Sequence, residues 1–350
     1  MLSNEIEEHL DELRSEPDLW NIFTRKEEYN PLFRDKYERF PYYLSTDRNI
    51  FEPKISKHLL ESGLKIEYPD GKKFAVCLTH DIDALFYSRM SILTDVGRHI
   101  LNDQLKDAFR RPFYNANKKW NPWWKFKEIM DLEEEFEAKS TFFIMGLKEG
   151  EWDFNYQAED LTQELGIIVD RGWEVGLHGG HEAYKDLMAL KRQKANLEET
   201  LGRKVMGYRN HFLRFKVPDT WELLKEAGFK YDTTFGYADS VGFRAGMCHP
   251  FRPFNLNTGK YVDLYEIPLT IMDSTLFDSY MRTDVSVAWD ITKQLIDTAR
   301  RYNGVINILW HNTYFNGKNL EFYAKILDYC NKKNAWLRSG ESIHNLWTQP

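Results

Sequence analysis

The sequence predicts an α/β protein, built as a distorted (β/α) barrel of about seven to eight parallel strands with an N-terminal helical extension. From Phe74 onward, short strand-like runs alternate with longer helix-like runs. This alternation is typical of βαβ units, whose strands pair in parallel. About eight strand-like runs are enough to close a sheet into a barrel. The connection 234–262 has no clear helical pattern, so we expect an irregular barrel.

The chain divides into an extension, residues 1–69, and a barrel, residues 70–350. The extension begins with Asn4, whose side chain can cap a helix while Glu7 reaches back to the first turn. The apolar positions that follow keep helical spacing: Ile6, Leu10 and Leu13. The remainder of the extension is charged and aromatic with few strand signals, which favours a helical lead-in packed on the barrel.

The barrel is expected to begin at the apolar run Phe74–Leu78, and strands and helices then alternate to the end of the chain. Strands are predicted at 74–79, 140–145, 173–178, 204–208, 229–233, 262–268, 305–310 and 335–338. Helices are predicted between them, at 124–137, 157–171, 187–201, 218–227, 286–302, 319–332 and 340–347.

Charge and composition exclude several classes of function. The net charge of −7 argues against nucleic acid as the main partner. No run approaches the roughly 18 apolar residues of a membrane span, and the N-terminus lacks the basic and apolar regions of a secretory signal. The cysteines Cys77, Cys248 and Cys330 are widely spaced and match neither a disulfide framework nor a thiolate zinc site. We therefore expect a cytoplasmic, reduced protein.

Segment 104–127 combines basic side chains with three tryptophans, Trp120, Trp123 and Trp124. We interpret it as a solvated insertion with one or two tryptophans packed underneath. The alternative is a surface at the mouth of the site that stacks on a sugar and contacts an anionic group.

Ionisable side chains recur where the predicted strands end. They are Asp81 and Asp83 after the first strand, His178 after the third, Arg209 and His211 after the fourth, and His311 after the seventh. The active sites of parallel barrels lie at the carboxyl ends of the strands, so these groups should converge. Alternate side chains of a strand share a face, which places Asp81 and Asp83 on one side. Carboxylates and imidazoles together suit a divalent metal ion with an acid or a base beside it.

Five motifs in fixed order make this interpretation more specific. They are Thr79-His80-Asp81-Ile82-Asp83, Ser140-Thr141-Phe142-Phe143-Ile144-Met145-Gly146, Gly176-Leu177-His178-Gly179-Gly180-His181, Arg209-Asn210-His211-Phe212 and Leu309-Trp310-His311. The combination resembles the NodB-homology polysaccharide deacetylases, carbohydrate esterase family four, in a variant whose first motif is Asp-x-Asp. The resemblance covers roughly residues 70–347. The family's fourth motif, Asp-x-x-Asp-Trp, is not recognisable, and segments 231–234 and 242–246 stand in that region without an assigned role.

The resemblance implies one divalent metal ion, with zinc expected, held by Asp83 and His178. It implies His181 as the third ligand. The histidine pair is spaced three residues apart instead of the family's four, so His211 and Glu182 remain as alternatives.

The resemblance also implies roles in catalysis and substrate binding. Asp81 would act as general base, with Arg209 holding it charged and oriented, and His311 would act as general acid. Phe212 and Trp310 are expected to contact the substrate, the Phe212 backbone amide helping to stabilise an oxyanion.

The expected function is metal-dependent hydrolysis of a linear amide, which removes an acetyl group from an N-acetylated saccharide. The expected compartment favours an intracellular precursor of surface-glycan biosynthesis as the substrate. One alternative is hydrolysis of another carbon–nitrogen bond, of the cyclic-amide type. The other is a catalytically silent module that binds metal or sugar.

Overall fold

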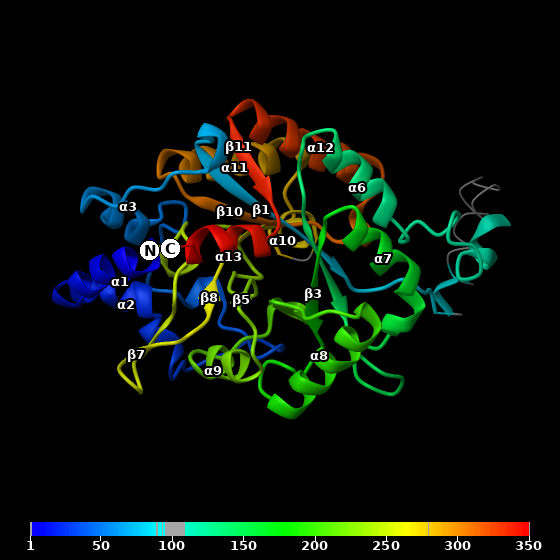
Figure 1. Cartoon of the computed structure of the whole chain (residues 1–350), viewed down its shortest axis with the longest axis horizontal. Helices are drawn as coiled ribbons and strands as arrows, with labels where there is room; N and C mark the ends of the chain where they lie inside the picture. The colour runs from blue at the N-terminus through cyan, green and yellow to red at the C-terminus, as the bar shows by residue number, and fades with distance from the viewer. Residues whose placement is uncertain (1, 89, 93, 95–108, 279, 350) are drawn as a thin grey trace.

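Nine parallel strands form the centre of the part of the chain that this computed structural model describes, residues 2–88, 90–92, 94, 109–278 and 280–349 (Figure 1). Eight of them follow the order β8-β5-β4-β3-β2-β1-β10-β9, and β11 pairs with the first half of β1. Their bounds are β1 (Phe74–Ile82), β2 (Thr141–Met145), β3 (Glu174–Gly179), β4 (Gly207–Asn210), β5 (Tyr231–Asp232), β8 (Tyr265–Glu266), β9 (Leu269–Met272), β10 (Val305–Leu309) and β11 (Ala335–Arg338).

The sheet curls because its two outer strands are consecutive in the chain. β8 pairs with β5 and β9 pairs with β10, while only Ile267 and Pro268 separate β8 from β9. Proline has no backbone N–H to donate to a ladder, so a single straight strand is not expected across this position. One bent segment therefore joins both ends of the sheet, and the predicted distorted barrel is confirmed.

Helices surround this sheet, and capping aspartates begin two of the long ones (Figure 1). The helices are α6 (Phe126–Glu134), α7 (Thr162–Asp170), α8 (Leu187–Leu201), α9 (Asp219–Glu226), α11 (Val285–Arg301), α12 (Gly317–Lys332) and α13 (Gly340–Thr348). Asp186 accepts hydrogen bonds from two amides of the first turn of α8, and Asp284 does the same for α11. Gly202 ends α8 in the left-handed conformation that glycine adopts readily.

All seven predicted barrel helices are present in the described residues, whereas the segment before β10 differs from its prediction. The predicted strand 262–268 contains only β8, and the strand β9 and the short helix α10 (Asp273–Phe277) follow it unpredicted. The connection 234–262 holds a two-stranded hairpin, β6 (Phe254–Asn255) and β7 (Lys260–Tyr261). Residues 104–108 of the basic, tryptophan-rich insertion lie outside the described residues.

The N-terminal extension packs on the barrel through three helices, α1 (Leu2–Glu12), α2 (Pro17–Thr24) and α3 (Lys54–Glu61). The predicted stripe of α1 is buried and belongs to the same hydrophobic core as the strands: Ile6, Leu10 and Leu13. The helix begins at Leu2, so Asn4 lies inside its first turn and not at its cap. α1 also contacts α13, which brings the two ends of the chain together (Figure 1).

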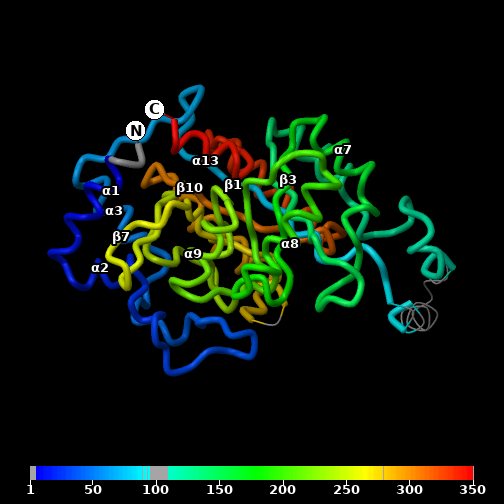
Figure 2. Tube along the Cα trace, turned by 60° about the horizontal axis from the view of Figure 1, so that its bottom comes forward, coloured from blue at the N-terminus to red at the C-terminus, as the bar shows by residue number. Residues whose placement is uncertain are grey.

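The stretch between α2 and α3 is largely irregular and runs along one side of the molecule (Figure 2). Its central residues reach the carboxyl ends of the strands, where Arg39 contacts the turn after β4. None of the helices among the described residues combines the length and the apolar character needed to traverse a bilayer.

Candidate metal centre

Ionisable side chains from three strand ends converge on Asp83, the second aspartate of the Asp-x-Asp motif. Two groups bring their ligand atoms within 4.8 Å of one another, Asp83 with His178 and His211, and Asp83 with Asp81 and His311. Asp83 Oδ1 lies 3.0 Å from His178 Nε2 and 3.8 Å from His211 Nε2. Asp83 Oδ2 lies 3.6 Å from His311 Nε2. The convergence predicted from the strand ends is therefore present.

The electrostatics of this cluster favour a charged Asp83. Burial raises the pKa of its carboxyl, but the imidazoles of His211, His311 and His178 outweigh burial and hold that pKa below its usual range. An ionised carboxylate is the form that ligates a metal ion.

The imidazoles of His178 and His211 are oriented by hydrogen bonds at the nitrogens that face away from Asp83. His178 Nδ1 lies 3.1 Å from the carbonyl oxygen of Arg209, so Nδ1 carries the proton and Nε2 faces Asp83. His211 Nδ1 lies 2.9 Å from Asp153 Oδ2, which leaves its Nε2 toward Asp83. Metal-ligating histidines almost always have such an outer partner, because it sets the ring orientation and raises ligand basicity.

Asp153 is a site residue that the sequence does not reveal. It lies in the irregular connection between β2 and α7, in a left-handed backbone conformation with φ of 68°. Burial raises the pKa of the Asp153 carboxyl. The hydrogen bond from His211 and the charges of His211 and His181 have the larger effect, so this pKa lies below its usual value. A lone aspartate in a loop carries no pattern that could have indicated this contact.

Of the three candidates for the third ligand, the structure brings His211 to Asp83 and His178. His181 belongs to neither group, since its Nδ1 faces Asp153 Oδ2 at 3.2 Å. Glu182 forms ion pairs with Lys185 and Arg214 and is about half exposed. His178 and Arg209 are register partners on β3 and β4, so His211, two residues beyond Arg209, continues the same face.

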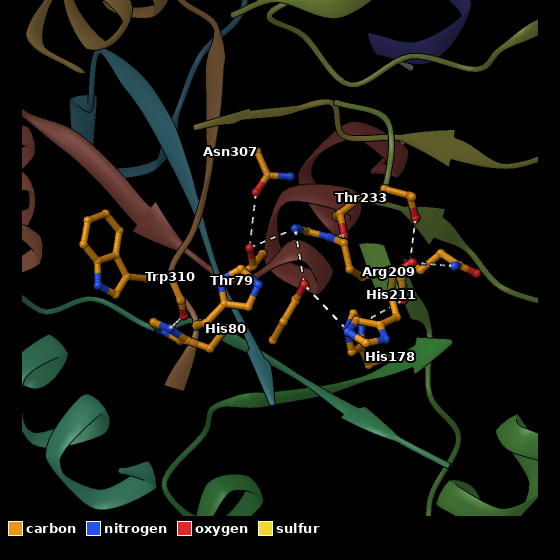
Figure 3. Close-up of polar contacts among 12 residues, drawn as sticks. Thr79, His80, His178, Arg209, His211, Thr233, Asn307 and Trp310 are labelled. Carbon is orange, nitrogen blue, oxygen red and sulfur yellow. Dashed lines mark hydrogen bonds and ion pairs between the residues drawn. The ribbon is translucent and has the colours of Figure 1, made fainter. Parts of the chain in front are cut away.

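Asp81 lies beside the group with one oxygen unengaged. Its Oδ2 lies 3.8 Å from His178 Nε2 and 4.0 Å from Arg209 Nη1. Its Oδ1 is buried and has no hydrogen-bond partner in the described part of the chain. Arg209 is held from the other side, with Nε donating to Thr233 Oγ1 at 2.9 Å and Nη2 to Thr79 Oγ1 at 3.0 Å (Figure 3).

His311 forms a tight pair with Asp273, a residue that none of the sequence motifs contains. His311 Nδ1 lies 2.6 Å from Asp273 Oδ1, and the backbone N–H of His311 donates to Asp273 Oδ2 at 2.6 Å. Burial lowers the pKa of His311, but the carboxylates of Asp273, Asp83 and Asp81 outweigh it and raise that pKa to about 10. His311 is therefore protonated at neutral pH. In the sequence, Asp273 could have been recognised as an acidic residue directly after an apolar strand, β9.

The donor set fits a divalent metal ion of the catalytic type. Two imidazoles and one carboxylate are a common protein contribution to zinc, and three protein ligands leave a position open for water or substrate. The unpartnered Asp81 Oδ1 supports this fit, because a buried carboxylate oxygen without a partner is costly unless something binds there.

A pocket of about 280 Å³ opens over the cluster. Its lining comes from the extension, the end of β1, the turn after β4, the end of β9 with the segment that follows it, and the segment after β10. The lining residues are Tyr37, Arg39, Asp81, Asp83, His211, Phe212, Leu213, Met272, Ser274, Asp278, Tyr280, His311, Thr313 and Tyr314. Phe212 is thus placed where substrate contact was expected.

Trp310 does not reach this pocket. Its side chain is fully buried and its ring stacks on Phe322 of α12, with the centroids 5.8 Å apart. Neighbouring residues of a strand point to opposite faces, so Trp310 lies outside the barrel when His311 lies inside it. Figure 3 shows Trp310 and His80 on one side of β1, with Arg209, His178 and His211 on the other. The expected substrate contact of Trp310 is therefore corrected to a packing role.

Comparisons with known proteins find similar solved structures. No protein-family model and no curated protein matches the sequence. Among solved structures, a Mycobacterium smegmatis protein assigned as a polysaccharide deacetylase is 19% identical, with 80% of this chain and 92% of that chain covered and a TM-score of 0.55. A peptidoglycan deacetylase from Bacillus subtilis is 12% identical, with 80% and 93% covered and a TM-score of 0.37. A family 4 carbohydrate esterase from Streptomyces lividans, solved with acetate, is 11% identical, with 77% and 93% covered and a TM-score of 0.39.

The likeness to the mycobacterial structure extends over most of both chains and is therefore a likeness of the whole barrel. It agrees with the curled parallel sheet of this chain. The chain has the NodB-like barrel fold of the polysaccharide deacetylases, the family that its motifs resemble.

Proposed function

We propose that this chain is a metal-dependent hydrolase that removes the acetyl group from an N-acetylated saccharide. The observation that carries the proposal is the meeting of a three-ligand group, a carboxylate with a free oxygen and a protonated histidine at one pocket. A metal ligand group, a base and an acid are the three parts that hydrolysis of an unactivated amide needs.

In this proposal Asp83, His178 and His211 hold the metal ion, and zinc is the ion expected for two imidazoles and one carboxylate. When bound, the ion would supply Lewis acidity, polarising the amide carbonyl and lowering the pKa of a nearby water. Asp153 holds the His211 ring from behind and the carbonyl of Arg209 holds the His178 ring, so both are preorganised.

Asp81 is the proposed general base. It lies in the cluster with its Oδ1 free, and the guanidinium of Arg209 stands 4.0 Å from its Oδ2. A cation at that distance attracts the carboxylate oxygen and so orients the Asp81 side chain. Asp81 would accept a proton from the attacking water as the new carbon–oxygen bond forms.

His311 is the proposed general acid. Its Nε2 faces the pocket and is protonated, while Asp273 holds Nδ1. It would donate its proton to the amide nitrogen as the carbon–nitrogen bond breaks, which releases acetate and a free amino sugar. An amine leaves far more readily when protonated, and a positioned acid of this kind contributes about a hundredfold to ten-thousandfold in rate.

The pocket lining supports a saccharide substrate. Aromatic rings and short polar groups both line it, with Phe212, Tyr280 and Tyr314 among the rings and Ser274 and Asp278 among the polar groups. Aromatic rings bury apolar sugar faces, and carboxylates and hydroxyls accept or donate hydrogen bonds to sugar hydroxyls. We also propose a cytoplasmic location and a precursor of surface-glycan biosynthesis as the substrate, which cell fractionation and assay of such precursors would test.

Acetate release is the expected result when purified, zinc-loaded protein is incubated with N-acetylated saccharides of increasing length. Enzymatic measurement of acetate, together with labelling of the new amine, checks both products of the proposed bond cleavage. Ring opening of a cyclic amide without acetate would favour the other carbon–nitrogen hydrolase. Zinc binding without any product from either substrate class would favour the silent binding module.

The identity of the third ligand gives a separate prediction. His211→Ala should weaken zinc binding strongly, whereas His181→Ala and Glu182→Ala should leave the affinity close to that of the wild type, because only His211 faces Asp83 and His178. Competition with a fluorescent chelator measures each affinity. A strong loss in His181→Ala with none in His211→Ala would return the ligand role to His181.

A further inference from the structure

The turn that carries His211 has an unusual backbone. Phe212 and Leu213 both adopt left-handed conformations, with φ of 59° and 53°. Residues with side chains rarely occupy this region, and they do so where surrounding contacts hold them. Contacts from neighbouring segments therefore hold this turn.

The N-terminal extension supplies the main contact, through Arg39. Its Nη1 donates to the carbonyl oxygen of Phe212 at 2.8 Å, inside the strained turn. Its Nη2 donates to Tyr280 Oη at 2.5 Å, and its Nε donates to Asp35 Oδ2 at 2.8 Å. Arg39 thus joins the extension, the turn after β4 and the segment before α11, three sides of the same pocket. Figure 2 shows the extension running beside the segment that follows β9.

Ring stacking connects the same segment of the extension to His211, the proposed metal ligand. The Tyr37 ring stacks on Phe212, with centroids 4.5 Å apart and planes 12° from parallel. The Phe212 ring stacks on His211, with centroids 3.9 Å apart. The carbon of the Arg39 guanidinium lies 4.8 Å from the Tyr37 centroid, on the same stack. A displacement of Arg39 would therefore move the Tyr37 and Phe212 rings and, through them, the His211 imidazole.

Arg39 is engaged chiefly with the protein itself. Its side chain is only 8% exposed, and each of its three guanidinium nitrogens donates to an acceptor of the protein. These bonds use three of the five N–H groups of the guanidinium. They suit the support of other groups.

We propose that Arg39 is a positioning residue, which holds the His211–Leu213 turn so that His211 points at Asp83 and His178. The inference deepens the proposed function and rests on its metal centre. It makes the N-terminal extension a part of the active site and not only a cover of the barrel. Outer supports of metal ligands typically contribute about tenfold to a hundredfold in metal affinity.

Zinc affinity of Arg39→Met, measured by chelator competition, tests the proposal. The expected result is an affinity weaker than that of the wild type by about tenfold to a hundredfold. Arg34→Met is the matched control, because Arg34 comes from the same segment but donates to the carbonyls of Glu28, Glu38 and Phe215 and not to the turn at residues 211–213. Its affinity should stay within about twofold of wild type, since mutations without shared partners act independently.

A double-mutant cycle separates positioning from a general loss of structure. If Arg39 acts through His211, Arg39→Met should have little further effect on zinc affinity in a His211→Ala background. Equal losses in both backgrounds would overturn the proposal, as would wild-type affinity in folded Arg39→Met.

Arg39→Lys carries the same test if Arg39→Met fails to fold. Lysine keeps a positive charge near Asp35, but its single ammonium cannot reproduce the guanidinium fork that reaches Phe212 and Tyr280. Arg39→Lys should bind zinc almost as weakly as Arg39→Met, and wild-type zinc affinity in Arg39→Lys would overturn the proposal. Absence of zinc binding by the wild type would instead overturn the metal centre itself, and the inference with it.

Discussion

His311→Ala is expected to lower kcat by about a hundredfold to ten-thousandfold while the protein keeps its zinc. Its Nε2 lies on the pocket side of Asp83, and the charge pair with Asp273 keeps it protonated. The variant lacks the proton donor for the departing amine, whereas Asp83, His178 and His211 remain. Steady-state acetate release and zinc content, measured on the same preparation, check the two halves of this prediction.

Asp273→Asn is the companion variant, because it keeps the shape of Asp273 and removes its charge. The pKa of His311 should then fall, since Asp273 is the largest of the charges that raise it. The basic limb of the pH–rate profile should move to lower pH, as the acid loses its proton earlier. Near-wild-type turnover in His311→Ala would remove His311 from the mechanism, and loss of zinc there would make it a ligand.

Asp83→Ala should abolish both zinc binding and acetate release. Asp83 is common to both groups of potential ligands, and its removal leaves the two imidazoles without the carboxylate between them. Wild-type protein should carry about one zinc equivalent, and the variant should carry almost none after dialysis against buffer with trace zinc. Elemental analysis by mass spectrometry measures both.

Asp278→Ala provides the control for Asp83→Ala. Asp278 also lines the pocket as a carboxylate, but it bonds to Tyr314 and belongs to neither ligand group. Its variant should retain zinc, with any change confined to substrate affinity. Full zinc occupancy in Asp83→Ala would contradict the proposed metal centre. Zinc loss in both Asp83→Ala and Asp278→Ala would indicate a nonspecific effect on the pocket.

Much of the fold follows from local patterns in the sequence. Strands are short and apolar, helices are amphipathic, and their alternation requires a parallel sheet, so the barrel and its seven helices could be predicted. The ends of the strands place Asp81, Asp83, His178, His211 and His311 at one edge by the geometry of a parallel sheet alone. The order of the five motifs along the chain is sufficient to indicate the family resemblance.

The choice of the third ligand depended on tertiary structure. His181 and His211 lie at similar strand ends, and the family resemblance implied His181 although its spacing from His178 departs from the family's. The register of β3 with β4 places His211 on the face that carries His178, and its Nε2 lies 3.8 Å from Asp83 Oδ1. Register and backbone conformation are not encoded in spacing, because both arise from packing between segments far apart in the chain.

The supporting residues were also beyond the reach of sequence patterns. Asp153, Asp273 and Arg39 each reach the site from a segment with no motif of its own, and each acts by touching a residue that has one. The prediction for Trp310 was wrong for the opposite reason. Trp310 belongs to a motif, but its side chain is buried on the outer side of the barrel. A sequence determines which groups stand at strand ends, whereas only the folded chain decides which side chains face one another, because that depends on contacts across the chain.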